Sequence, residues 1–155
     1  MVAPPYLHPL LKPIHSTAAL VFISLSLPLA ASALPVPDAT LGTQNIPLGP
    51  TVVQVNGGTT VGQNLFHSFA SFDIDTGEAV FFASPANINH IFSRVTGDGP
   101  STIDGLLGTI GSDADLFLMN PNGVMFGPNA SLNVQGSFIV TTADIIEFGE
   151  TGRFS

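Results

Sequence analysis

The sequence of residues 34–155 predicts an all-β fold, and within that class a parallel β-helix, a solenoid of short strands stacked coil on coil. Gly, Asn, Asp or Pro interrupts the apolar runs every four to eight residues. Two Pro-Asn turns lie seven residues apart, which leaves room for one short strand between them. An ordinary sandwich has turns only about every 8–12 residues. The expected strands are Thr51–Val55, Asn64–Phe72, Ala79–Phe82, Asp115–Met119, Val124–Phe126, Ser131–Val134, Ser137–Thr142 and Ile145–Phe148.

Local alternation supports strands in the second half of the chain. Leu132 and Val134 alternate with polar neighbours, as expected for a strand with one buried face. Two short segments, Pro85–Ser93 and Thr102–Leu107, are the only helix candidates. No fixed-period repeat accompanies these patterns, so an irregular jelly roll stays open as the alternative to a solenoid.

The two Pro-Asn turns suit the corners of such a coil. An Asn side chain can bond its own backbone two residues on, Pro sets φ for the next position, and Asn and Gly suit the positions that follow. The segment Val124–Phe126 would then form one short side of a coil between two corners. The first corner consists of Asn120, Pro121, Asn122 and Gly123, and the second of Gly127, Pro128 and Asn129.

The first 33 residues have the features of a secretory signal peptide. Lys12 and the α-amino group supply positive charge, Thr17–Leu29 is apolar, and Ala31 and Ala33 form a small-x-small cleavage signature. A membrane anchor is the alternative, but it needs about 20 apolar residues, and this run is shorter and contains a proline. We expect cleavage after Ala33, which leaves residues 34–155 as one domain.

Charge and cysteine content exclude several classes of function. Residues 34–155 hold all eleven acidic side chains but only two basic ones, Arg94 and Arg153. Nucleic acid and anionic lipid would both be repelled by this excess of negative charge. The sequence has no cysteine, which excludes thiol catalysis, thiolate metal sites and disulfides.

The remaining polar residues offer little for catalysis or metal binding. Residues 34–155 contain two histidines, His67 and His90, and no Gly-x-Ser-x-Gly turn accompanies Ser68. We expect both histidines on the surface. Two pairs of carboxylates lack the Gly-rich loop of a calcium site and are interpreted as a solvated acidic face; they are Asp73 with Asp75 and Asp113 with Asp115. The expectation is a protein without enzymatic activity, cofactor or metal.

Aromatic composition argues against a sugar-binding surface. The chain has twelve Phe and no Trp, and its one Tyr, Tyr6, lies in the predicted signal. Carbohydrate sites usually present Trp or Tyr, whose rings carry a polar group. We therefore expect the Phe side chains to stack in the core, including Phe66, Phe81, Phe82, Phe117 and Phe138.

The stretch NPNGV at 120–124 resembles the Asn-Pro-Asn-Gly-Ile signature of the filamentous haemagglutinin N-terminal domain, the secretion domain of two-partner-secretion exoproteins. The likeness extends over about residues 39–154, with segments in the form common in cyanobacterial relatives. Val124 replaces the usual Ile, and the Asn-Pro-Asn-Leu companion motif is absent, which indicates a divergent branch. The matching segments are NLFHSF (64–69), AVFF (79–82), IFSRV (91–95), IDGL (103–106), LFLMNPNGVMF (116–126) and GPNASLNVQGSFIVTT (127–142).

This resemblance implies a right-handed parallel β-helix with short extra-helical strands that cap its N-terminal end. It also implies export through the Sec translocon, recognition by the periplasmic domains of an outer-membrane transporter, and nucleation of folding in an adhesin-like passenger. The implied location is the cell surface or the medium. The motif residues 120–124 would carry the secretion role.

Two other functions stay open as alternatives, a secreted β-helical carbohydrate-binding protein and a polysaccharide-degrading enzyme. The second needs clustered acids with a basic residue, and residues 34–155 contain only two arginines. At roughly 20–25 residues per coil, the domain would make about five coils. Because Arg153-Phe154-Ser155 looks like the start of a further strand, we expect a truncated chain whose parent continues as a β-helix.

Overall fold

A computed structural model describes residues 33–150 and 152–155, and these form strands and turns without any helix. No part of this described region could therefore span a membrane as a helix. Residues 1–32 of the predicted signal peptide, which include Ala31, lie outside the described residues. The strands are β1 (Val36–Pro37), β2 (Thr43–Pro47), β3 (Val52–Gly57), β4 (Thr59–Val61), β5 (Asn64–Ser71), β6 (Ala79–Ala83), β7 (His90–Val95), β8 (Ser101–Ile103), β9 (Leu106–Ile110), β10 (Asp115–Met119), β11 (Val124–Phe126), β12 (Ser131–Asn133), β13 (Phe138–Thr141), β14 (Ile146–Phe148) and β15 (Gly152–Phe154).

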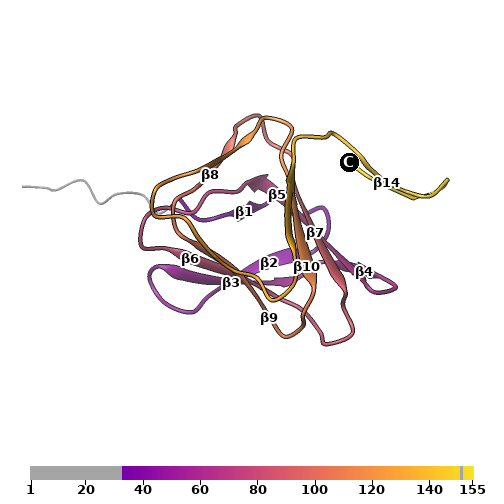
Figure 1. Ribbon diagram of the computed structural model, residues 1–155, viewed down its shortest axis with the longest axis horizontal. Helices are drawn as coiled ribbons and strands as arrows, with labels where there is room; N and C mark the ends of the chain where they lie inside the picture. The colour runs from indigo at the N-terminus through magenta and orange to yellow at the C-terminus, as the bar shows by residue number, and fades with distance from the viewer. Residues whose placement is uncertain (1–32, 151) are drawn as a thin grey trace, which may run out of the picture. The chain divides into compact units, whose positions relative to one another are not determined.

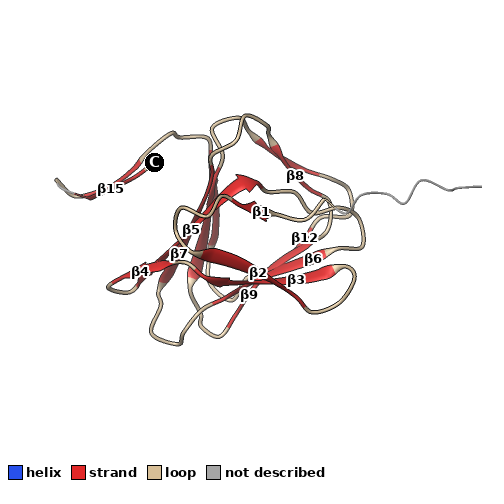
Figure 2. Ribbon diagram, turned by 180° about the vertical axis from the view of Figure 1, so that it is seen from behind, coloured by secondary structure: helices blue, strands red, loops and turns tan. Residues whose placement is uncertain are grey.

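The strands stack into a parallel β-solenoid of about four coils with three faces (Figures 1 and 2). Face A holds β5, β7, β10 and β13, and face B holds β3, β6, β9 and β12, each in that order. Face C holds β8 and β11, and an isolated bridge from Ile74 to Ile103 extends it by one coil. All of these pairs are parallel, which confirms the predicted β-helix over the jelly roll.

The coils differ in length, which explains why the sequence shows no fixed period. Partners in adjacent strands lie 27 residues apart for Val52 and Ala79, but only 22 apart for Leu116 and Phe138. The expectation of five coils is wrong, because residues 33–51 serve as a cap and several coils exceed 25 residues. The strands keep register while the corner loops absorb the difference.

Antiparallel strands cap the N-terminal end of the solenoid, as the resemblance implied. On face A, β1 and β4 pair with the two halves of β5, and on face B, β2 pairs with β3. Asp38, just after β1, holds this cap to the first two coils. Its carboxylate accepts hydrogen bonds from the hydroxyls of Ser68 (2.5 Å) and Thr96 (2.9 Å). These end strands satisfy the backbone groups that the first coil would otherwise expose.

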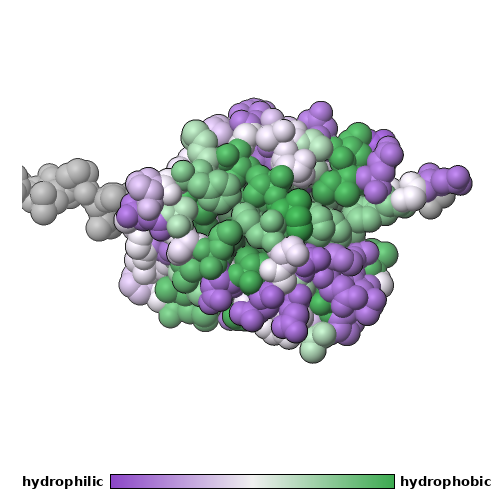
Figure 3. Space-filling model, viewed as in Figure 1, coloured by the Kyte–Doolittle hydropathy of each residue, from purple (hydrophilic) through white to green (hydrophobic). Residues whose placement is uncertain are grey.

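The core consists of side chains that stack in register from coil to coil. On face B, Val53, Val80 and Leu107 are 3%, 0% and 0% exposed, and their in-register successor Leu132 is 51% exposed. Face C repeats the trend, because Ile103 is buried and Phe126 is half exposed. In Figure 1 the last coil faces the viewer, and Figure 3 shows apolar residues gathered across that face. The interior of the last coil is thus open along the solenoid axis.

The phenylalanines divide between the core and the outside of face A, which corrects the sequence prediction. Phe82 is fully buried and Phe138 packs against the core, as expected. Phe66, Phe92 and Phe117 instead form an outer aromatic stripe, with ring centroids 5.2 and 4.6 Å apart. The hairpin β14–β15 covers it through Phe148 and Phe154. Phe81 is also placed outside, on face B, where it lies against Gly108.

Both helix candidates are wrong. The segment Pro85–Ser93 contains a turn and the first part of β7, and Thr102–Leu107 contains parts of β8 and β9. Side chains on both sides of β7 are covered, Ile91 by the core and Phe92 by the hairpin, so β7 lacks the alternation that marks a half-buried strand. Contiguous apolar residues in a covered strand are hard to distinguish from a helix.

We expect Leu107→Ala to lower the free energy of unfolding by about 2–5 kcal/mol, because it opens a cavity inside a closed coil. Leu132→Ala removes the same atoms from the next coil of the same stack, where the side chain is half exposed, and should cost under about 1 kcal/mol. Urea denaturation of the two variants measures both. Equal losses would contradict the open last coil.

Candidate functional site

The Asn-Pro-Asn-Gly corner is a tight turn between β10 and β11. The Gly123 N–H donates to the carbonyl oxygen of Asn120 at 3.0 Å, and the Asn122 N–H donates to Asn120 Oδ1 at 2.9 Å. Gly123 has φ of 108°, a conformation that side chains disfavour. Val124 follows and packs against the core. Asn120 and Gly123 therefore occupy the turn positions that suit their residue types.

The Asn120 side chain is fully buried. Its Nδ2 donates to the carbonyl oxygen of Gly99 at 3.1 Å and to Ser101 Oγ at 3.0 Å, both in the preceding coil. Its Oδ1 is used by the turn itself. Asn120 therefore fastens the third coil to the second and offers no atom to an outside partner.

The exposed half of the corner is formed by Pro121 and Asn122. Asn122 Nδ2 donates to the carbonyl oxygen of Gly97 at 2.8 Å, which fixes the side chain across the coil boundary. Pro121 and Asn122 line a polar crevice of about 280 Å³ together with Arg94, Val95, Thr96, Gly97, Asp98, Met119, Asp144 and Ser155. This crevice brings the motif beside one of the two arginines of the domain, which the sequence did not link to it.

Arg94 is held in place from three sides. Its Nε donates to Ser68 Oγ at 2.9 Å, its Nη2 lies 3.4 Å from Thr40 Oγ1, and its guanidinium carbon lies 5.1 Å from the centre of the Phe154 ring. Ser68 also binds Asp38. Burial raises the pKa of Asp38, but hydrogen bonds from Ser68, Thr40 and Thr96 outweigh it and lower the pKa to about 2. The carboxylate therefore stays charged at any physiological pH.

The second corner joins three coils rather than presenting a surface motif. The Ala130 N–H donates to the carbonyl oxygen of Gly127 at 3.2 Å, across Pro128. Asp104 in the preceding coil accepts a bond from the Asn129 N–H at 2.8 Å and another from the Thr76 hydroxyl, one coil earlier still. These bonds, the Thr76 one first, lower the pKa of Asp104. A Cβ at Gly127 would meet the Asp104 carboxylate at 2.1 Å, so the corner requires glycine there.

Several predicted polar residues serve the same structural purpose. Asp73 Oδ1 accepts the Thr102 N–H at 2.8 Å, and Asp115 Oδ1 accepts the Ser137 N–H at 2.7 Å, each one coil further on. Within the described ranges no group of three or more His, Cys, Asp or Glu could hold a metal ion. These carboxylates compensate backbone donors at coil boundaries.

The two histidines have opposite environments, and the expectation of surface positions is wrong for His67. His67 is 0% exposed inside the first coil. His90 lies outside on face A, with Nδ1 2.9 Å from Asn64 Oδ1 and Nε2 4.0 Å from Asp115. Strand alternation predicts this placement, since Leu65 and Phe69 flank His67 on the inward side. The described hydroxyl that contacts either ring is that of Thr43, 3.2 Å from His67 Nδ1, and Thr43 and His67 are both buried.

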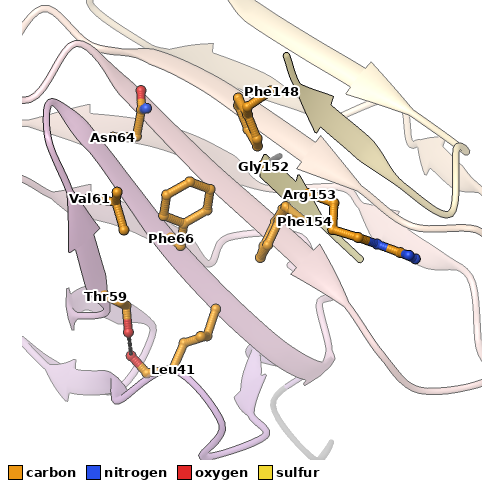
Figure 4. Close-up of a pocket in the computed structure, with 9 residues that line it drawn as sticks. All are labelled: Leu41, Thr59, Val61, Asn64, Phe66, Phe148, Gly152, Arg153 and Phe154. Carbon is orange, nitrogen blue, oxygen red and sulfur yellow. Dashed lines mark hydrogen bonds between the residues drawn. The ribbon is translucent and has the colours of Figure 1, made fainter. Parts of the chain in front are cut away.

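An apolar pocket of about 330 Å³ lies where the β14–β15 hairpin meets β4 and β5. Figure 4 shows Phe66 between Val61 on one side and Phe148 and Phe154 on the other. The Arg153 side chain points away from these rings in the same view. The pocket thus presents hydrocarbon and aromatic rings, with Thr59 and Asn64 as its uncharged polar lining.

We expect Asn120→Ala to destabilise the domain by about 1–3 kcal/mol, because it leaves the buried Ser101 hydroxyl and the Gly99 carbonyl without their donor. Asn122→Ala, its matched control in the same turn, removes one exposed bond and should cost about 1 kcal/mol or less. Thermal or urea unfolding distinguishes the two. A larger loss for Asn122→Ala would contradict the assignment of Asn120 as the fastening residue.

Comparison with known proteins assigns the domain. Residues 33–155 match the TPS secretion domain family, which is a family of secretion domains and not of enzymes. The chain is 39% identical over 83 residues to the heme/hemopexin-binding protein of Haemophilus influenzae. That match covers 54% of this chain and 9% of the relative, so the chain spans only a small part of that protein's length. The chain therefore belongs to the TPS secretion domain family, the secretion domain of two-partner-secretion exoproteins of the filamentous haemagglutinin type.

Proposed function

We propose that this domain directs export of an adhesin-like exoprotein and then acts as the template on which the exoprotein's β-helix folds. In this proposal the chain enters the periplasm through the Sec translocon, with cleavage after Ala33. The periplasmic domains of an outer-membrane transporter then recognise it, and it emerges at the cell surface. The family match supports the secretion role, and the open last coil supports the template role.

The exposure of the in-register core is the observation that carries the template role. Leu107 is fully buried by the strand of the next coil, whereas Leu132 and Phe126 are about half exposed. The strands β12 and β13 end their sheets, so their backbone edges are free on the side away from β9 and β10. An added coil would bury these side chains and pair these edges at once. The N-terminal end cannot serve in this way, because β1, β2 and β4 already cover it.

The exposed half of the first corner supports the recognition role. Pro121 and Asn122 are fixed by turn geometry and by the bond to Gly97, so a partner meets them without an ordering cost. The crevice beside them carries Arg94, Asp98 and Asp144, which offer both signs of charge. A polar strand or loop of the transporter fits this chemistry better than an apolar one.

Secretion of the Asn122→Ala variant tests recognition. We expect a smaller secreted fraction with normal expression when the chain and its transporter are co-produced, because the variant loses the exposed amide but keeps Asn120. Asn129→Ala is the matched control, an exposed Asn that follows Pro at the other corner, and should be secreted normally. Normal secretion of the double variant Asn120→Ala, Asn122→Ala would reduce the motif to a structural turn.

A passenger fused after Ser155 tests the template. Leu132→Lys with Phe126→Lys places charges on the open coil, so we expect a β-helical passenger to stay protease-sensitive although the domain itself remains folded. Val61→Lys alters an equally exposed apolar residue at the capped end and should leave the passenger resistant. A passenger as resistant in the double variant as in the wild type and in Val61→Lys would argue against templating while leaving the secretion role intact.

A further inference from the structure

The first coil contains a polar side chain where the solenoid interior is otherwise apolar. His67 on β5 faces inward in register with Ser93 on β7, and the two are 0% and 1% exposed. The next members of the same stack are Leu118 and Val140. The His67 ring packs against Phe82 with centroids 5.3 Å apart. An imidazole is thus enclosed by aromatic and aliphatic groups.

The His67 ring contacts the Thr43 hydroxyl. Thr43 Oγ1 accepts the Ser68 N–H at 3.1 Å and lies 3.2 Å from His67 Nδ1. The hydroxyl can donate to Nδ1 or accept from an Nδ1–H, so either neutral tautomer of the ring makes this hydrogen bond. His67 Nε2 and Ser93 Oγ have no hydrogen-bond partner within the described residues. Among the described residues, Thr43 is therefore the hydrogen-bond partner of the neutral ring.

The same contact joins the N-terminal cap to the first coil. Thr43 is the first residue of β2, and its hydroxyl binds β5 between the stretches that pair with β4 and β1. Gly58, between β3 and β4, also lies close to the ring, because a Cβ there would lie 2.8 Å from His67 Cε1. Displacing the ring would therefore disturb β2 and the start of β4 together.

The surroundings of His67 cannot accept a charge. The described groups that face it are Thr43 from β2, Gly58, Phe69 of its own strand, Phe82 from β6 and Ser93 from β7, and none of these is titratable. The charged side chains of Asp38 and Arg94 both bind the hydroxyl of Ser68, the residue next to His67. Because neighbouring residues in a strand face opposite sides, this hydroxyl lies on the side of β5 that is opposite to the His67 ring. Burial lowers the pKa of His67 to about 4.

From this geometry we infer that His67 is an acid-sensitive latch, which holds the N-terminal cap closed while its ring is neutral and releases β2 when the ring is protonated. An opened cap exposes the ring to water, where its pKa returns to about 6.5. The open form then binds a proton that the closed form rejects. The latch contributes its full stability above about pH 6.5 and loses it as the pH falls towards 4. The device goes beyond the secretion role and does not depend on a transporter.

Residue-resolved hydrogen exchange on the exported chain tests the latch. After correction for the intrinsic pH dependence of exchange, opening of the Ser68 amide and the β2 amides should rise about 30-fold between pH 7.5 and 5. The β9 amides, deep in the stack, should change far less. His90→Gln removes the exposed histidine and should leave the wild-type pH dependence, whereas His67→Gln should abolish it. Thr43→Val should speed exchange of the Ser68 amide already at pH 7.5, because it deletes the hydroxyl that this amide bonds.

Two results would overturn the inference. One is an acid response in His67→Gln as large as in the wild type, and the other is equal acid sensitivity of β2 and β9, which would mean global unfolding. Should His67→Gln fail to fold, a direct NMR titration of the wild-type His67 imidazole decides the matter. A midpoint below pH 5 supports the latch, and a midpoint near 6.5 contradicts it.

Discussion

In-register stacking of inward side chains from one coil to the next is the constraint on which the rest of this structure depends. Because each coil buries the one before it, Val53, Val80 and Leu107 form a continuous column although their loops differ in length. The same constraint makes the two ends unlike. The first coil needs a cap of antiparallel strands, whereas the last coil exposes the positions that the preceding coils bury. The two ends of the solenoid thus differ in their packing even without a partner.

Corners must satisfy backbone groups at each coil boundary without breaking this register. Short polar side chains do so by reaching one coil back or forward. Asn120 binds Gly99 and Ser101, Asp104 binds Asn129, and Asp115 binds the Ser137 N–H. Many of the acidic residues that give the chain its low pI are therefore structural acceptors. The motif at 120–123 combines both needs, since its buried Asn fastens the coils and its exposed Pro-Asn step remains available to a partner.

The sequence predicted the fold class and the corners because both are local. Short apolar runs between Gly, Asn and Pro indicate coils, and Asn-Pro-Asn-Gly indicates a turn whatever surrounds it. The misses depend on contacts that no local pattern reports. The β7 strand has both faces covered, so Ile91 and Phe92 show no alternation, and Gly108 suggests a break although it sits in a strand beneath Phe81. The surface prediction for His67 is wrong because it follows from residue type, whereas the position between Leu65 and Phe69 puts the ring on the inward side. Arg94 lies beside the motif because the stacking of the coils places it next to Met119 at the end of β10, and no local sequence pattern reports this.

An exported solenoid has to meet two opposite requirements, a chain that stays open during passage and a fold that forms without covalent help afterwards. The absence of cysteine removes any early cross-link. Most of the strand pairing joins one coil to the next, so little of the fold can form before several coils are present. The first coil differs from the others in such a scheme, because antiparallel cap strands rather than another coil close its outer side. Placing His67 and Thr43 there, rather than a purely apolar pair, adds to the other cap contacts one that depends on a neutral imidazole. The capped end of the solenoid is then the end whose closure responds to acid.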